Sequence, residues 1–465
     1  MMNLVMLASD YLIFLLVIMG SILLIRAHQQ NQLVGFVRKI FYRPLNLVAG
    51  IILITYILIG LLDSIHYRPN KSEDTQNGSI ISVLDKMLKP ISMQSERSFS
   101  APFAIFAFTK ETMKLPSGEV SRDYPRLTYA GTHLKDKTHH LSDIRQRLIN
   151  IAVQNLIIWL VLSIMLLLYA SVKHGISFEQ MLCAVIRGKT IFPWRTLLLT
   201  MGVLSFLLIA IYSFIPFYHI LGTNQVGEDV LYQSLKSIRT GLIIGTITTL
   251  VMLPFAILFG IMAGYFRGWV DDVIQYVYTT LSSIPGVLLI AAAVLTLQLV
   301  MDRHSDWFAT AMQRSDIRLL ALCAILGITS WTGLCRLLRG ETLKISEMDY
   351  VKAAHSLGVK DFKIIFKHFL PNVVHIILIT LTLDFSGLVL AEAVLSYVGV
   401  GVDPSSYSWG TMINSARLEM ARVPVVWWSL TAAFVFMFTL VLAANIFSDA
   451  VRDAFDPHSE LRGAR

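Results

Sequence analysis

The sequence is poor in charged residues and in cysteine. Only 15% of its 465 residues are charged, whereas a soluble globular protein carries about a quarter. Its three cysteines, Cys183, Cys323 and Cys335, form no Cys-x-x-Cys pair, so no zinc or redox motif is indicated. The chain also lacks a Gly-x-x-x-x-Gly-Lys-Ser/Thr phosphate loop, which excludes an ATPase of that type within it.

Long apolar runs take the place of the missing charge. Hydrophobic residues make up 55% of the chain and are gathered into runs long enough to cross a bilayer as helices. The runs are 4–25, 45–62, 151–171, 197–217, 240–264, 272–300, 318–337, 372–395 and 426–447. The first has no basic residue before it and Arg26 after it, the reverse of a signal peptide, so we expect a retained anchor. The predicted fold is all-α, a polytopic membrane helical bundle of about nine transmembrane helices with a small external loop domain.

Basic residues gather in three of the connections between runs. They are Arg26, Arg38, Lys39 and Arg43; Lys173, Arg187, Lys189 and Arg195; and Arg336, Arg339, Lys344, Lys352, Lys360, Lys363 and Lys367. The positive-inside rule makes all three connections cytoplasmic. The prediction is a multi-pass protein of the bacterial inner membrane, with nine spans, an external N-terminus and a cytoplasmic C-terminus. The net charge of +8 is thereby explained, and we expect no nucleic-acid partner.

A polar stretch over 64–150 interrupts the apolar runs. The topology places it outside the membrane, because long loops translocate largely regardless of their charge. The alternation over Phe103–Phe108 suggests short strands. Its histidines have no cysteine or carboxylate cluster beside them, so no residue is assigned to a metal and no cofactor is expected.

The connection 338–371 carries the strongest local signal. Small residues at Ala353 and Ala354 favour a short helix from Asp349, and Gly358 can end it. A second helical stretch, 361–369, leads to Pro371, which suits the first turn of the next span. Two short helices joined at a glycine would form a rigid projection on the cytoplasmic side.

This connection resembles the EAA motif of ABC-importer permeases, and in particular the C-type subunits of the oligopeptide, dipeptide and nickel branch. Ala353, Ala354, Gly358, Leu370 and Pro371 fall at the motif's spacing. Lys352 stands where the motif has glutamate, and His368 stands at its hydrophobic position. The branch often varies at the first position and carries His-x-Leu-Pro at the second.

Further blocks resemble the same branch in the correct order over about 219–465. They begin at His219, Ala263, Ser283, Ala391, Ser408 and Asn445. The domain organisation predicted is 1–63, N-terminal transmembrane helices; 64–150, the external loop or small domain; 151–218, an additional transmembrane hairpin; and 219–465, the permease core with its cytoplasmic coupling loop 338–371. Either 4–25, 45–62 and 151–171 form an added module, or 45–62 and its loop match the usual beginning and 151–217 is inserted.

The resemblance implies a permease subunit of a binding-protein-dependent importer that moves peptides. It implies a B-type permease partner, two cytoplasmic ABC ATPase subunits, an external solute-binding protein and contact with membrane lipid. The chain itself is then not an enzyme. A nickel or other small-solute importer is the alternative within the class; a membrane enzyme or a membrane sensor is the alternative outside it.

The resemblance also assigns functional residues. Asp349, Lys352, Ala353, Ala354, Gly358, Leu370 and Pro371 are expected to couple ATP use to transport, and no residue is expected to be catalytic. Asp384 lies near the middle of a span, where a charge is costly unless it meets water or a partner. Asp384 and Glu392 are therefore candidates for the translocation pathway, with a structural hydrogen bond as the alternative, especially for Glu392.

Overall fold

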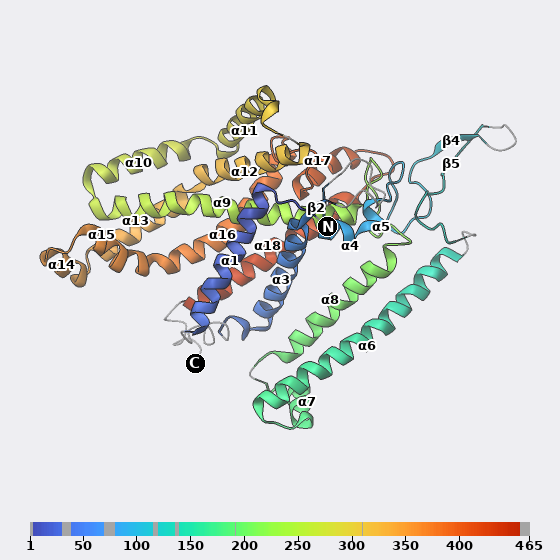
Figure 1. Ribbon diagram of the computed structural model, residues 1–465, viewed down its shortest axis with the longest axis horizontal. Helices are drawn as coiled ribbons and strands as arrows, with labels where there is room; N and C mark the ends of the chain where they lie inside the picture. The colour runs from blue at the N-terminus through green and yellow to red at the C-terminus, as the bar shows by residue number, and fades with distance from the viewer. Residues whose placement is uncertain are drawn as a thin grey trace. The chain divides into compact units, whose positions relative to one another are not determined.

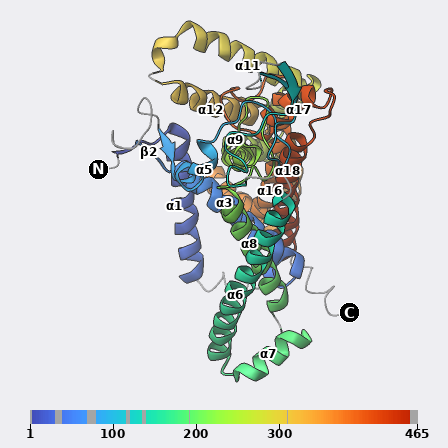
Figure 2. The same cartoon turned by 90° about the vertical axis from the view of Figure 1, so that its right-hand side faces the viewer.

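The computed structural model describes residues 3–29, 39–68, 80–114, 120–134, 139–190, 192–308 and 310–455 (Figures 1 and 2). Its contacts divide the chain into two compact units. The first unit comprises Met1–Leu4, His28–Ile238 and Ser415–Ala443, and the second comprises Val5–Ala27, Arg239–Asn414 and Ala444–Arg465. Each unit is described by itself.

The first unit combines three long helices with short strands and short helices. Its elements are β1 (Asn3–Leu4), α3 (Pro44–Ser64), β2 (His66–Arg68), β3 (Ile81–Ser82), α4 (Val83–Met87), α5 (Lys89–Ser92), β4 (Glu111–Lys114), β5 (Val120–Asp123), α6 (His140–His174), α7 (Phe178–Arg187) and α8 (Trp194–Phe214). Strands β1, β2 and β3 form an antiparallel sheet in that order, and β4 and β5 form an antiparallel pair with Thr112 opposite Arg122.

The strand prediction for Phe103–Phe108 is wrong. Phe103 adopts a left-handed φ of 57°, and the Ala104 amide donates to the Ala101 carbonyl at 3.0 Å. This turn breaks the extended backbone that a strand needs. Only an isolated bridge between Phe106 and Arg126 remains, and the regular pairing lies in β4 and β5.

Helices α6 and α8 run side by side as a hairpin, with α7 across their ends in both views (Figures 1 and 2). The Trp159 indole packs against Gly202 so closely that a Cβ on this glycine would lie only 2.8 Å from the ring. The indole N–H donates to the Leu198 carbonyl at 2.7 Å. Ser205 donates to the Asn155 side chain at 2.6 Å. A glycine contact and polar bonds of this kind hold helices together in lipid, where apolar burial gives little driving force.

The second unit is a helical bundle. Its elements are α1 (Ala8–Gln29), α9 (Val230–Phe266), α10 (Gly268–Ser283), α11 (Gly286–Arg303), the 3₁₀ turn η2 (Ser305–Trp307), α12 (Ala311–Ser330), α13 (Thr332–Ser346), α14 (Asp349–Ser356), α15 (Asp361–Ile364), the π-helical turn η3 (Ile365–Phe369), α16 (Leu370–Tyr397), α17 (Trp409–Glu419) and α18 (Trp428–Phe455). Helices α1, α9, α17 and α18 contribute residues to both units.

Glycines set the closest helix contacts in this bundle. A Cβ on Gly245 would lie 2.3 Å from Phe385, and one on Gly260 would lie 2.7 Å from Leu338. Gly264 meets Thr342 in the same way, at 2.5 Å. Helix α9 therefore packs on α13 and α16 through positions that admit no side chain.

Eight helices of the described residues are long and apolar enough to span a membrane. They are Pro44–Ser64, His140–Lys173, Trp194–Phe214, Val230–Phe266, Gly286–Arg303, Ala311–Ser346, Asp361–Tyr397 and Trp428–Ala454. The ninth predicted span corresponds to α1, whose shorter apolar part is Ala8–Ile22. The polytopic helical membrane bundle predicted from the sequence is confirmed.

One apolar run differs from its prediction. The run 272–300 is not one helix, because α10 ends at Ser283 and α11 begins at Gly286. Ile284 between them is extended, with φ −88° and ψ 131°, as the residue before a proline prefers to be. Pro285 thus divides a run that composition alone presents as continuous.

Candidate functional site

The connection between α13 and α16 folds as two short helical pieces around a glycine turn. Asp349 lies in the first turn of α14, where a carboxylate favours the helix N-terminus. At the other end, Gly358 takes a φ of 71°, and the Val359 amide donates back to the Ala354 carbonyl at 3.1 Å. This geometry ends the helix and favours glycine. The helix and its glycine stop, predicted from the sequence, are both present.

Three buried side chains fix this connection to the bundle. Val351 is 4% exposed, and Ile364 and Phe369 are fully buried. All three belong to one apolar cluster with residues of α9, α10, α13 and α16. Tyr265 of α9 also donates to the Asp361 carboxylate at 2.7 Å. The coupling loop is therefore a rigid projection, since each of its helical pieces has an anchor in the core.

A chain of charges links the coupling loop to the turn between α9 and α10. The Glu347 carboxylate accepts from Arg267 at 2.5 Å and pairs with Lys352 at 2.9 Å. The Arg267 hydrogen bond, followed by that of Lys352, lowers the pKa of Glu347 to about 2. Lys352, which stands at the motif's glutamate position, thus has an acidic partner in its own loop.

The coupling loop exposes large apolar side chains among its polar ones. Leu357 is 83% exposed, Phe362 is 73% exposed, and the Phe362 and Phe366 rings lie 4.5 Å apart. Large exposed apolar side chains on a polar connection are what a protein partner would cover. Sequence reasoning missed these three residues. Their signal was a bulky apolar side chain directly before the predicted glycine stop and two more on the stretch behind it.

The predicted coupling residues fall into two groups. Asp349, Lys352, Ala353, Ala354 and Gly358 lie together on α14 and its turn, with Ala353 exposed and Ala354 half-buried. Leu370 and Pro371 lie instead in the first turn of α16. Leu370 packs on the same apolar cluster as Val351, so both groups share one support.

The two predicted pathway residues have different surroundings. Asp384 is half-buried on α16, and within the described part of the chain no hydrogen bond or ion pair joins its carboxylate. Glu392 is 3% exposed and accepts a hydrogen bond from Ser396 at 2.6 Å. A Cβ on Gly410 would lie 2.9 Å from its Oε1. Glu392 therefore has the environment of a structural residue, whereas Asp384 does not.

A buried histidine lies between two carboxylates in the first unit. His219 Nδ1 is 2.7 Å from Asp229, and Nε2 is 3.6 Å from Glu96. Glu96 also accepts the backbone amides of Thr128 and Tyr129, each at 2.8 Å. The sequence marked His219 as the start of a block but gave no sign of Glu96. The cluster joins the polar stretch 94–130 to the segment before α9.

This cluster predicts a stability optimum at mildly acidic pH. Burial alone would lower the pKa of His219, but its hydrogen bond to Asp229 and the nearby Glu96 carboxylate raise it to about 9. Burial alone would raise the pKa of Glu96, but His219 and the backbone amides of Thr128, Tyr129 and Ala130 hold it at about 2. The histidine's contribution is complete below its ordinary pKa of about 6.5 and is lost as pH rises through about 9. The glutamate's contribution is complete above 4.5 and is lost as pH falls through about 2.

Limited proteolysis of the membrane-embedded protein between pH 5 and 10 measures this effect. Cleavage within 94–134 is expected to accelerate above about pH 9 in the natural chain. His219→Gln should abolish that alkaline acceleration, and His304→Gln, at an exposed position, should leave it in place. An unchanged alkaline limb in the His219 variant would contradict the prediction.

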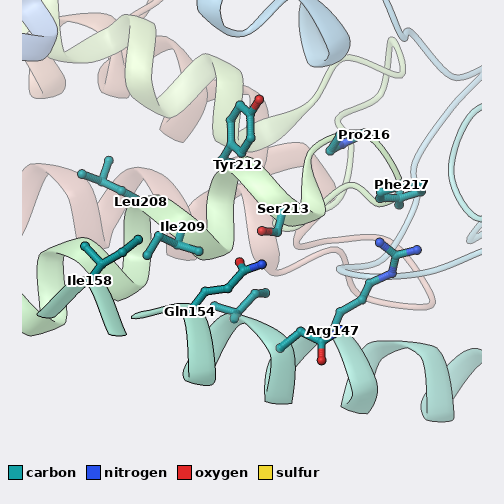
Figure 3. A pocket seen from close by; sticks show the side chains of 11 residues that line it. Arg147, Gln154, Ile158, Leu208, Ile209, Tyr212, Ser213, Pro216 and Phe217 are labelled. Atoms are coloured by element: carbon teal, nitrogen blue, oxygen red, sulfur yellow. The ribbon is translucent and has the colours of Figure 1, made fainter. Parts of the chain in front are cut away.

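A groove of about 700 Å³ lies between α6 and α8. Figure 3 shows Gln154, Ser213 and Arg147 among its apolar side chains. The Arg147 guanidinium is already bound to Asp143 at 2.9 Å and lies 3.7 Å from the centre of the Phe217 ring. Arg147, the cation that lines the groove, is thus already paired within the protein. We therefore assign no functional role to this groove.

Comparisons with known proteins agree with this geometry. Residues 256–460 match the family model described as "Binding-protein-dependent transport system inner membrane component". The chain is 31% identical over 249 residues to the oligopeptide transport system permease protein OppC of Mycobacterium tuberculosis, covering 53% of this chain and 79% of that one. It is 32% identical over 241 residues to the glutathione transport system permease protein GsiD of Pectobacterium atrosepticum, covering 51% and 72%. It is 29% identical over 243 residues to the dipeptide transport system permease protein DppC of Bacillus subtilis, covering 51% and 68%.

Proposed function

The chain belongs to the binding-protein-dependent transport system inner membrane component family and is a C-type permease subunit of a peptide ABC importer, and from this premise we propose that its coupling loop receives the partner ATPases. The relatives are named for oligopeptides, glutathione and dipeptides, which favours peptides over nickel as the transported solute. A membrane enzyme or sensor has no comparable support.

The observation that carries the proposal is the rigid coupling loop with its exposed apolar surface. Leu357 and Phe362 are available to enter a cleft on a soluble ATPase, while Val351 and Phe369 hold the loop to the bundle. A push on this surface would reach the spans, because the loop has little freedom to absorb it. The other partners proposed are a B-type permease and an external solute-binding protein.

Uptake of labelled peptides tests the function. A strain that lacks this chain but keeps its partner genes should lose uptake of di- or oligopeptides and regain it with the natural sequence. Added nickel should not compete. Peptide uptake that persists without the chain would contradict the assignment.

We propose that Asp384 faces the translocation pathway or the partner permease. The lack of a partner for its carboxylate within the described residues supports this placement. Asp384→Ala should reduce peptide uptake about tenfold or more while the subunits still assemble, because a pathway charge acts on the transported solute. Unchanged uptake would remove Asp384 from the pathway, and lost assembly would make it a structural residue. Thr382→Ala, two residues before Asp384 on the same helix, is the control.

We further propose that the N-terminus is external and the C-terminus cytoplasmic, with α1 as the first of nine spans. The basic connections support this orientation, and α1 has 22 residues, about 33 Å of helix. Reporter fusions after position 30, which lies outside the described residues, should report cytoplasm, and fusions after Lys110 should report the exterior. The opposite result at both positions would reverse the topology.

A further inference from the structure

Helix α7 has a wider apolar face than the α6–α8 hairpin covers. Met181 and Val185 are buried against Leu167, Ala170 and Leu198 of the hairpin. Leu182 and Ile186, one position further along, are 36% and 64% exposed. Because successive residues turn by about 100° around a helix, these two form a single uncovered apolar flank beside the buried one.

Four basic side chains surround the ends of this helix. Lys173, Arg187, Lys189 and Arg195 are all exposed. Within the described residues, none of the four forms an ion pair. An Arg195 guanidinium nitrogen would lie 3.4 Å from a Cβ on Gly188, so Arg195 folds back over the turn that ends α7. The turn thus gathers four cations from α6, α7 and α8 against one acid, Glu179, which is exposed in the first turn of α7.

The hairpin determines where this cluster sits. Helices α6 and α8 are both candidate membrane spans, and α7 connects the C-terminal end of α6 to the N-terminal end of α8. The joining helix must then lie at a membrane surface. Phe192 and Trp194, whose rings are 5.1 Å apart, stand at the start of α8, the position where aromatic side chains mark the interface.

We propose that α7 and its flanking cations form a binding site for the phosphate headgroups of anionic phospholipids, which lie in the inner leaflet in the orientation proposed above. Lys173, Arg187, Lys189 and Arg195 bind the phosphates, and Leu182 and Ile186 enter the acyl region beneath them. A helix with an apolar flank and an excess of basic residues at its edge has the composition that recognises an anionic membrane surface. The site lies outside the matched family region, 256–460.

Native mass spectrometry of the purified full-length chain tests the proposal. The protein is delipidated and titrated with phosphatidylglycerol or phosphatidylcholine. The natural chain should retain phosphatidylglycerol about tenfold more than phosphatidylcholine, since the exposed basic residues attract the net negative headgroup and not the neutral one. The variant with Lys173, Arg187, Lys189 and Arg195 all changed to Gln should lose that preference. The control changes four exposed basic residues of the external stretch, Lys86, Lys89, Lys110 and Arg145, and should keep it.

Cys183 supplies a second readout that needs no charge variant. It is exposed on α7, whereas Cys323 and Cys335 are buried, so an environment-sensitive thiol dye reports on α7 alone. In nanodiscs, replacing a third of the phosphatidylcholine by phosphatidylglycerol should shift the dye emission to the blue. Equal lipid retention by natural and four-fold variant chains, or an emission indifferent to phosphatidylglycerol, would overturn the proposal. Neither result bears on peptide uptake, so the proposed transport function is judged separately.

Discussion

Gly358→Val is expected to leave the protein inserted in the membrane and to reduce both ATPase co-purification and peptide uptake about tenfold or more. A β-branched residue at a φ of 71° costs about 1–2 kcal/mol in backbone strain. The turn relieves that strain by shifting α14 and Leu357 on the surface proposed for the ATPase. Loss of about 1.4 kcal/mol of binding corresponds to a tenfold weaker complex.

Gly175→Val is the matched control for this variant. Gly175 has a φ of 64°, ends helix α6, and like Gly358 has open space around the missing Cβ. Both variants carry the same backbone strain, and only one of them alters the coupling loop. Equal effects of the two would show that strain, not coupling, is measured. Leu357→Ser with Phe362→Ser removes the apolar surface without touching the backbone and should give the same loss as Gly358→Val.

Arg239→Met is expected to destabilise the second unit by about 3–5 kcal/mol, because it leaves buried carboxylates without their cation. Arg239 lies 2.7 Å from Asp10 and 3.9 Å from Asp316. Asp10 has no exposed surface, and Asp316 is 5% exposed. Ser9 completes the cluster by donating to Asp316 from its backbone amide at 3.1 Å. This cluster ties α1 to α9 and α12, so α1 should detach first.

Thermal unfolding and proteolysis of α1 in the detergent-solubilised protein measure this loss. Arg314→Gln breaks the exposed pair with Asp302 and should cost less than about 1 kcal/mol. Neutralising the acids as well, with Asp10→Asn and Asp316→Asn added to Arg239→Met, should restore much of the stability. If the Arg239→Met variant unfolds at the same temperature as the Arg314→Gln variant, the buried cluster does not hold α1.

The sequence predicts elements whose signals are local. The end of α14 at Gly358 and the start of α16 at Pro371 follow from the conformational limits of glycine and proline. The break at Pro285 was available by the same reasoning, but the apolar run around it is continuous enough to suggest one helix. The mean hydropathy of a segment shows only that it is apolar. One proline changes this mean very little, although its missing N–H group can end a helix.

The buried ionic clusters could not be predicted in the same way. Asp10 and Arg239 are separated by 229 residues, and Glu96 and His219 by 123, so nothing in either neighbourhood indicates the other. A single sequence shows only that each charge is unusual in an apolar or folded context. Partners at such separations follow from tertiary packing. The same holds for Leu357 and Phe362, because exposure depends on what the rest of the fold leaves uncovered.

The pairing of Lys352 with Glu347 has a consequence for protein engineering. A design that averages over the family would change Lys352 to glutamate, the residue that the EAA motif carries at that position. Here the change would set two carboxylates side by side and leave Arg267 to neutralise both. Glutamate at position 352 is therefore the wrong choice in this chain unless Glu347 is changed to a basic residue at the same time. The two positions must be mutated together.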